Sequence, residues 1–175
     1  MTAEAEHQAQ SFAPVIDAGA KLLILGSMPG QRSLEQQQYY AHPRNAFWPI
    51  MAELLGFDVD LPYNERLAQL TRHGIALWDV LAECRRPGSL DSSIVEQSIR
   101  PNDFAALLDL HPTIGAIFFN GAKAEQAFKR YVLPTLSDRQ QQLTRQRLPS
   151  TSPAHAAMKL SQKKLFWKEQ LGSVL

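Results

Sequence analysis

Short apolar runs alternate along the chain with segments whose apolar residues recur at helical spacing. Three of these runs, 21–26 (KLLILG), 74–80 (GIALWDV) and 113–121 (TIGAIFFNG), show no alternation of polar and apolar positions. Runs of this kind are typical of strands that are buried on both faces of a parallel sheet. A fourth strand is predicted over 142–150 (QLTRQRLPS), where the pattern is the weakest of the four.

Helices are predicted between and after these strands. Apolar residues recur at helical spacing over 45–55 and 63–73, and a glycine follows each segment as a stop signal. Further helices are predicted to begin at Pro101, to follow the third strand over 121–131, and to close the chain over 159–171.

The alternation of strands and helices predicts the fold class. We expect an α/β protein of three layers, with a central, mainly parallel four-stranded sheet flanked by helices. The 175 residues show no internal repeat and no break in composition, so residues 1–175 are expected to form a single domain. The polar stretch at the N-terminus, within residues 1–18, is expected to be flexible or loosely docked.

Composition excludes several classes of protein. The hydrophobic content of 45% and the net charge of +1 are unlike those of a disordered chain. A single cysteine, Cys84, excludes a disulfide framework and favours a cytoplasmic compartment. No apolar run approaches the roughly 20 residues that cross a bilayer, and the N-terminus lacks the pattern of a secretory signal. His42 and His73 have no partners at metal-ligand spacing, so neither a metal nor another cofactor is expected.

Charge is distributed unevenly along the chain. Residues 1–120 contain 8 basic and 14 acidic residues, whereas residues 121–175 contain 10 basic and 3 acidic residues. A basic region of this kind favours a polyanionic partner such as nucleic acid, although lysines that merely solvate helix surfaces would give the same count.

The carboxyl ends of parallel strands are where such sheets bind ligands. The first predicted strand ends in GSMPG (26–30), which has neither the Gly-Lys-Ser/Thr of a P-loop nor a G-x-G-x-x-G fingerprint. The stretch QQQYYAHPRNAFW (36–48) follows, and its aromatic and amide side chains can stack on and hydrogen-bond to nucleobases. Within it, Asn45 can also cap a helix and Trp48 can belong to the core.

These motifs together carry a resemblance to a known family. GSMPG after a strand, YAHPRNAFW (40–48) and LPSTSPAHA (148–156) resemble the uracil-DNA glycosylase superfamily over roughly residues 20–170. In the mismatch-specific uracil-DNA glycosylases the first motif is similar to GINPG, and a catalytic Asn stands where this chain has Met28. A thioether cannot activate water, so this position departs from that pattern. The hypoxanthine DNA glycosylase branch is similar in combining GSMPG with a downstream Asn, which is Asn45 here.

The resemblance implies a DNA repair enzyme that flips a deaminated base, hypoxanthine or uracil, out of DNA and hydrolyses its N-glycosidic bond, leaving an abasic site. It implies that Asn45 positions the water or the sugar. Asp79 would accept the ring N–H of the base, unless it caps the following turn instead. The two motif turns lack a lysine, which implies hydrolysis without lyase action.

Further site residues are implied by the same resemblance. The turn Gly26, Ser27, Met28 and Pro29 would bind the base carbonyl, and Tyr40 or Tyr39 would form a wall of the pocket. Phe47 would stack on the base, a contact worth about 1–3 kcal/mol, while Asn120 would contact the base or cap the next helix. DNA contacts are expected from Gly30, Ser150, Ser152, His155, Lys159 and Lys163.

Some alternatives remain open at this stage. His155 would either stabilise the leaving base or touch a phosphate, and Met158 or Leu160 would enter the gap left by the flipped base. The chemistry could act on uracil instead, or the fold could bind DNA without catalysis. A nucleotide-binding module is disfavoured by the missing P-loop lysine. We expect a monomer whose partner is DNA and which does not bind a membrane.

Overall fold

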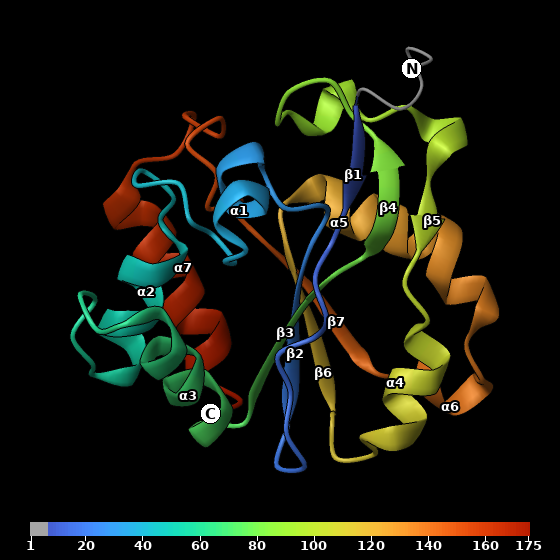
Figure 1. The fold of residues 1–175 in the computed structure, drawn as a ribbon. Helices are drawn as coiled ribbons and strands as arrows, with labels where there is room; N and C mark the ends of the chain where they lie inside the picture. The colour runs from blue at the N-terminus through green and yellow to red at the C-terminus, as the bar shows by residue number, and fades with distance from the viewer. Residues whose placement is uncertain (1–6) are drawn as a thin grey trace.

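The computed structural model describes residues 7–175, and a four-stranded parallel sheet lies at its centre (Figure 1). The strand order is β3-β2-β6-β7. The strands are β2 (Leu22–Gly26), β3 (Ile75–Asp79), β6 (Ala116–Asn120) and β7 (Thr144–Leu148). The predicted α/β fold with a parallel four-stranded sheet is therefore confirmed, including the strand with the weakest pattern.

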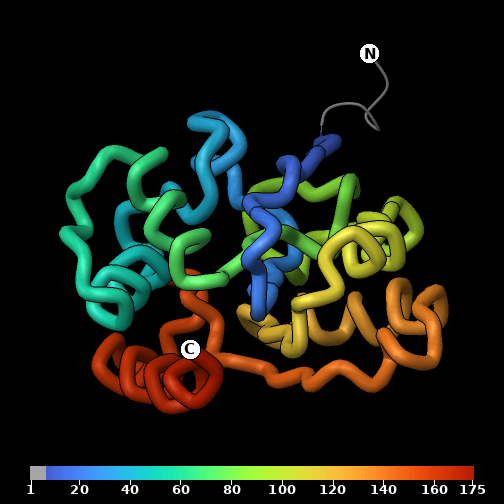
Figure 2. Tube along the Cα trace, turned by 90° about the horizontal axis from the view of Figure 1, so that it is seen from below, coloured from blue at the N-terminus to red at the C-terminus, as the bar shows by residue number. Residues whose placement is uncertain are grey.

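Helices cover both faces of this sheet, which explains why its inner strands read as continuous apolar runs. Leu22 and Ile24 of β2 face α2 (Phe47–Leu55), α3 (Tyr63–Arg72) and α7 (Leu160–Gly172). Leu23 and Leu25 face the side of α4 (Phe104–Leu110) and α5 (Ala122–Ala127), and α6 (Asp138–Gln141) lies beyond them. Figure 2 shows the two helix groups on opposite sides, teal and red on one, yellow and orange on the other.

A second, antiparallel sheet was not predicted. It consists of β1 (Gln8–Gln10), β4 (Leu81–Arg85) and β5 (Arg100–Pro101), in the order β1-β4-β5. The expectation of a loosely docked N-terminus is wrong for Gln8–Gln10, which pair with β4, and Val15 forms a further bridge to Leu77. Residues 1–6 of that expectation lie outside the described residues.

One helix boundary and one short helix also differ from the expectation. Pro101 does not begin a helix, because it pairs with Leu81 at the edge of the second sheet; the helix begins at Phe104, where the Asp103 carboxylate accepts a bond from Ala106 N. A short polar helix, α1 (Gln31–Gln36), was not predicted. None of the helices among residues 7–175 has the length and apolar character required to span a membrane.

Candidate active site

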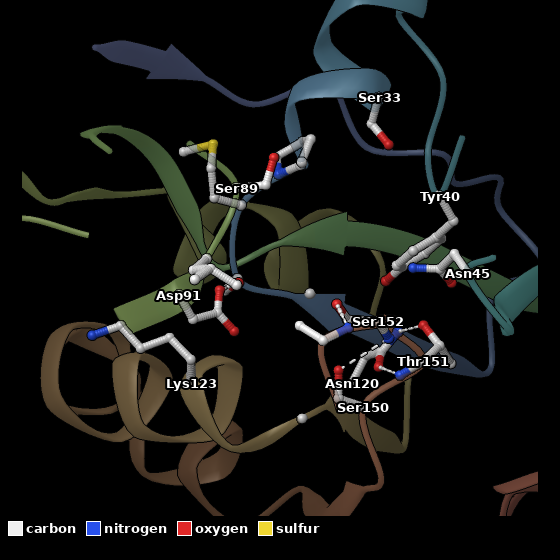
Figure 3. A pocket seen from close by; sticks show the side chains of 18 of the residues that line it. Ser33, Tyr40, Asn45, Ser89, Asp91, Asn120, Lys123, Ser150, Thr151 and Ser152 are labelled. Carbon is white, nitrogen blue, oxygen red and sulfur yellow. Dashed lines mark hydrogen bonds between the residues drawn. The ribbon is translucent and has the colours of Figure 1, made fainter. Parts of the chain in front are cut away.

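A cavity of about 520 Å³ opens at the carboxyl end of the parallel sheet (Figure 3). The ends of β2, β3 and β6 contribute Gly26, Asp79 and Asn120 to its wall. The segment after β7 adds Ser150–His155, and the loops around 40–45 and 89–92 complete the wall. The cavity thus lies where the topology of a parallel sheet places ligands, and it is large enough for a purine base.

Gly26 is required by the close approach of two strand ends. It pairs with Asp79 in the parallel register. A Cβ atom on Gly26 would lie 2.5 Å from Asp79 Oδ1 and 3.2 Å from the Tyr40 hydroxyl. The first glycine of the GSMPG turn therefore leaves room for the carboxyl group that forms the floor of the cavity.

Asp79 is a buried carboxyl group with an unused hydrogen-bonding atom. Its side chain is 3% exposed, and Asp79 Oδ2 has no hydrogen-bond partner among the described residues. Burial raises the pKa of the Asp79 carboxyl to about 7, with a further increase from Asp91 and an opposing effect of Arg86. Near neutral pH the group is therefore present both as a carboxylate that accepts a hydrogen bond and as an acid that donates one.

Phe47 does not form part of the cavity wall, which corrects the stacking role expected for it. Its side chain is fully buried, and the ring of Tyr40 covers it at a centroid distance of 4.1 Å and an angle of 27°. Tyr40 has a left-handed backbone conformation (φ 55°) that places its ring over Phe47 and toward the cavity. The aromatic face available to a base is therefore that of Tyr40, whose hydroxyl is buried without a partner among the described residues.

Asn45 lies beside Tyr40 in the cavity wall (Figure 3). Its Oδ1 accepts a hydrogen bond of 2.9 Å from Phe47 N, which fixes the amide at the start of α2. The Nδ2 group can then donate to a water or a sugar oxygen. Asn45 is therefore not the N-cap of α2, since Ala46 occupies that position, but its side chain bonds the first residue of the helix and lies in the cavity wall.

Asn120 connects the sheet to the loop after β7. Its Nδ2 donates to Thr151 Oγ1, its Oδ1 accepts from Thr151 N, and both distances are 2.9 Å. Asn120 is therefore not a helix cap, since Gly121 occupies that position in front of α5. Thr151 O in turn accepts a bond from Ala46 N, so this buried threonine joins the Asn45 segment to β6. Sequence reasoning missed Thr151, because nothing in its pattern distinguishes it from the serines beside it.

The GSMPG turn is held by residues of the loop after β4. The Ser27 hydroxyl donates to Asp91 Oδ1 at 2.6 Å. Its proton is therefore not available to a base carbonyl, which corrects the role expected for Ser27. Arg86 is 3% exposed and donates to Pro29 O at 2.7 Å and to Gly88 O at 2.8 Å. Arg86 and Asp91 were not identified from the sequence, because their loop carries no periodic pattern that would mark them.

The expected DNA-binding residues fall into two groups. Gly30, Ser150, Ser152 and His155 line the cavity, whereas Lys159 and Lys163 do not. Lys163 is buried, and its ammonium group donates to His155 O at 2.8 Å and to Ser152 O at 3.4 Å. The role expected for Lys163 is thus corrected. Its side chain hydrogen-bonds to backbone carbonyls of the 150–155 loop and does not face a phosphate.

Basic side chains near the cavity are partly neutralised. Lys123 lines the cavity, but its ammonium group forms an ion pair with Glu96, which also accepts a hydrogen bond from the Tyr131 hydroxyl. These bonds lower the pKa of Glu96, so it is ionised at neutral pH. Across residues 7–175, no group of three or more His, Cys, Asp or Glu side chains is placed to hold a metal ion.

Known proteins resemble this chain in sequence and in fold. A family model for the uracil DNA glycosylase superfamily matches residues 13–171. The chain belongs to this superfamily. Among its relatives, a hypoxanthine DNA glycosylase from Methanosarcina barkeri is 41% identical over 116 residues, covering 66% of this chain and 72% of that protein. A hypoxanthine DNA glycosylase from Methanosarcina acetivorans is 35% identical over 147 residues, covering 79% and 92%.

A solved structure from the superfamily has the same fold. It is the solution NMR structure of a candidate uracil DNA glycosylase from Methanosarcina acetivorans. This protein is 33% identical to the present one and matches it with a TM-score of 0.74, over 93% of this chain and 98% of that chain. The superfamily recognised from the GSMPG and LPSTSPAHA motifs is thereby confirmed.

Proposed function

We propose that this protein is a monofunctional DNA glycosylase that excises hypoxanthine from DNA and leaves an abasic site. The observation that carries the proposal is the cavity at the sheet's carboxyl end, in which an oriented amide, an aromatic face and a buried carboxyl group converge. Membership of the superfamily and the two hypoxanthine DNA glycosylases among its relatives support it.

The target base must leave the duplex to reach these groups. A base inside the stack is inaccessible, and enzymes that act on it rotate the nucleotide into a pocket. The cavity of about 520 Å³ accommodates such a base, with the ring of Tyr40 as a stacking surface. Base–aromatic stacking of this kind contributes about 1–3 kcal/mol.

Asn45 would act on the sugar side of the reaction. Its neutral amide cannot remove a proton from water, but Nδ2 can position a water for attack on a sugar that has become cation-like. This suffices when the glycosidic bond breaks ahead of nucleophilic attack. The bond between Asn45 Oδ1 and Phe47 N keeps the amide oriented before the substrate arrives.

Asp79 would act on the base side in its protonated form. The leaving base develops negative charge, which a buried carboxylate would repel and a carboxylic acid would stabilise by donating a hydrogen bond. The unpartnered Oδ2 atom and the pKa of about 7 both fit an acid that holds its proton in the cavity. As a donor, Asp79 would bind a base carbonyl, which hypoxanthine and uracil carry and adenine lacks.

DNA would be held by the rim of the cavity. The Ser150, Ser152 and His155 side chains and the backbone at Gly30 lie there, and serine hydroxyl and backbone N–H groups are common phosphate ligands. The ion pair between Lys123 and Glu96 supports hydrolysis over lyase chemistry, because it engages the lysine that lines the cavity.

Uracil is the second candidate substrate, and the superfamily to which the chain belongs favours it. Both bases present a carbonyl next to a ring N–H, so the Asp79 contact alone does not separate them. The test is excision from matched oligonucleotides that carry dI, dU, a T opposite dG, or no lesion. Rapid release of hypoxanthine supports the proposal. Release of uracil alone would show that the substrate is uracil instead of hypoxanthine. DNA binding without release of any base would contradict the enzymatic function.

A further inference from the structure

Thr151 is a buried residue in the loop after β7, at a point where two walls of the cavity meet. It is 1% exposed. Its Oγ1 accepts a hydrogen bond from Asn120 Nδ2 and its N–H donates one to Asn120 Oδ1, at the end of β6. Its carbonyl oxygen accepts a third, of 2.9 Å, from Ala46 N. Figure 3 shows Thr151 and Asn120 bonded to each other, with Asn45 on the same side of the cavity. Thr151 therefore connects the end of β6 and the loop after β7 to the segment before α2.

The bond to Ala46 acts directly on the backbone of Asn45. The Ala46 N–H and the Asn45 carbonyl belong to one planar peptide group, so the Thr151 carbonyl holds the plane that follows the Asn45 Cα atom. On the other side of that atom, Asn45 N donates to His42 O at 2.9 Å. The Asn45 side chain in turn accepts a hydrogen bond from Phe47 N. The direction of the Asn45 Nδ2 group thus depends on a backbone that Thr151 helps to fix.

The other attachments of the loop after β7 lie at its two ends. Trp167 Nε1 donates to Pro149 O at 2.9 Å, and Lys163 Nζ donates to His155 O at 2.8 Å. Both donors belong to α7. Within residues 7–175, the carbonyl of Thr151 provides the only hydrogen bond between this loop and the segment before α2. The contact that reaches the catalytic amide therefore passes through the middle of the loop and not through α7.

We propose that Thr151 and Asn120 are positioning residues that orient Asn45 by fixing the backbone beside it. The proposal rests on the proposed function, since it assigns these residues an effect on base excision through Asn45. A misplacement of about 1 Å in a positioned group can lower a rate by about 100-fold. The loop after β7 is also expected to contact DNA, so Thr151 links the DNA-binding surface to the group that acts on the sugar.

The first test is single-turnover excision from a dI duplex at saturating protein. Thr151→Val removes the hydroxyl with little change of shape, and Asn120→Ala removes both bonds to Thr151. Each is expected to lower the rate constant by tenfold or more, while Kd for the duplex changes less than threefold. Thr151→Ser keeps the hydroxyl and should retain most of the rate. Thr113→Val is the matched control, because the Thr113 hydroxyl also donates to a backbone carbonyl, Ala20 O at 2.6 Å, but Thr113 does not line the cavity.

The second test repeats Thr151→Val and Asn120→Ala in an Asn45→Ala background. Without the amide there is nothing left for these residues to orient, so each is expected to change the remaining rate less than twofold. Residues that act through one another are non-additive in this way, whereas independent effects add. A general loss of structure, or direct contact of Asn120 with the base, would lower the rate by the same factor in both backgrounds. That result would overturn the proposal.

A third measurement does not depend on catalysis. Amide hydrogen exchange followed by NMR reports on the Phe47 N–H, which donates to Asn45 Oδ1. Thr151→Val is expected to accelerate exchange at Phe47 by tenfold or more, and Thr113→Val to leave it unchanged. Equal exchange at Phe47 in Thr151→Val and wild-type protein overturns the proposal. Absence of any excision by the wild-type protein would instead contradict the proposed function, and the exchange at Phe47 would still decide whether Thr151 holds Asn45.

Discussion

The buried carboxyl of Asp79 makes the stability of this protein depend on pH in a specific way. The pKa of Asp79 rises from 3.8 to about 7 on folding, chiefly because of burial. A raised pKa in an acid means that the folded protein holds the proton more tightly than the unfolded chain. The stabilisation from Asp79 is therefore fully present below about pH 4 and is lost as the pH rises to about 7.

The size of this effect follows from the shift. One pKa unit corresponds to about 1.4 kcal/mol, so a rise of roughly three units lowers the free energy of unfolding by roughly 4 kcal/mol at pH 8. Asp79→Asn keeps the shape of the side chain and cannot ionise. We expect the variant to exceed the wild-type free energy of unfolding by about 1–2 kcal/mol at pH 5 and by roughly 4 kcal/mol at pH 8.

Urea denaturation followed by tryptophan fluorescence, at several pH values between 5 and 8, measures this difference. Asp60→Asn is the matched control, because Asp60 lies on the surface. A difference between Asp79→Asn and wild type that is constant over this range, or wild-type protein that is the more stable at pH 8, would refute the reasoning. Excision by the wild-type enzyme is also expected to decline as the pH rises through 7. The Asp79→Asn variant keeps an N–H donor at this position at every pH, so its profile should be flatter.

Three further substitutions test how the site is held together. Gly26→Ala places a Cβ against Asp79 and is expected to cost about 1–3 kcal/mol of unfolding free energy in urea titrations, with Gly115→Ala, where space is open, as an unaffected control. Arg86→Met removes the donors to Pro29 O and Gly88 O and should lower the free energy of unfolding by about 2–4 kcal/mol. Arg86→Lys should recover only part of this loss, because one ammonium group cannot reach both carbonyls. Full recovery by Arg86→Lys would contradict the role of the two hydrogen bonds. Lys163→Met removes the hydrogen bonds that hold the 150–155 loop, so KM for duplex DNA should rise more than kcat falls in steady-state assays. An unchanged KM would show that DNA binding does not depend on these hydrogen bonds.

The central sheet could be predicted from the sequence because its signals are local. Each buried strand is a continuous apolar run, and β2 contributes alternate side chains to the two helix layers. The second sheet could not be predicted, since β1 has three residues and β5 has two. Strands this short carry no periodicity, and they form only because β4 lies between them.

The site was predictable where it follows from topology. Asp79 and Asn120 end parallel strands, and the carboxyl ends of such strands must converge. The order of stacking between Tyr40 and Phe47 was not predictable, because sequence does not reveal which of two nearby aromatic rings lies outermost. Arg86 could not be predicted because its loop carries no periodic pattern and because its partners are backbone carbonyls, which every residue has.

The measurement that tests the account most directly is single-turnover release of hypoxanthine from a dI duplex by wild-type protein, Asn45→Ala and Asn64→Ala. Asn64 is an exposed asparagine on α3 and serves as the control for loss of an amide. The account predicts release by the wild type and Asn64→Ala, and a loss of about a hundredfold or more for Asn45→Ala at a retained melting temperature. Equal rates for Asn45→Ala and the wild type would contradict the role of Asn45, and no release by any of the three would contradict the proposed function.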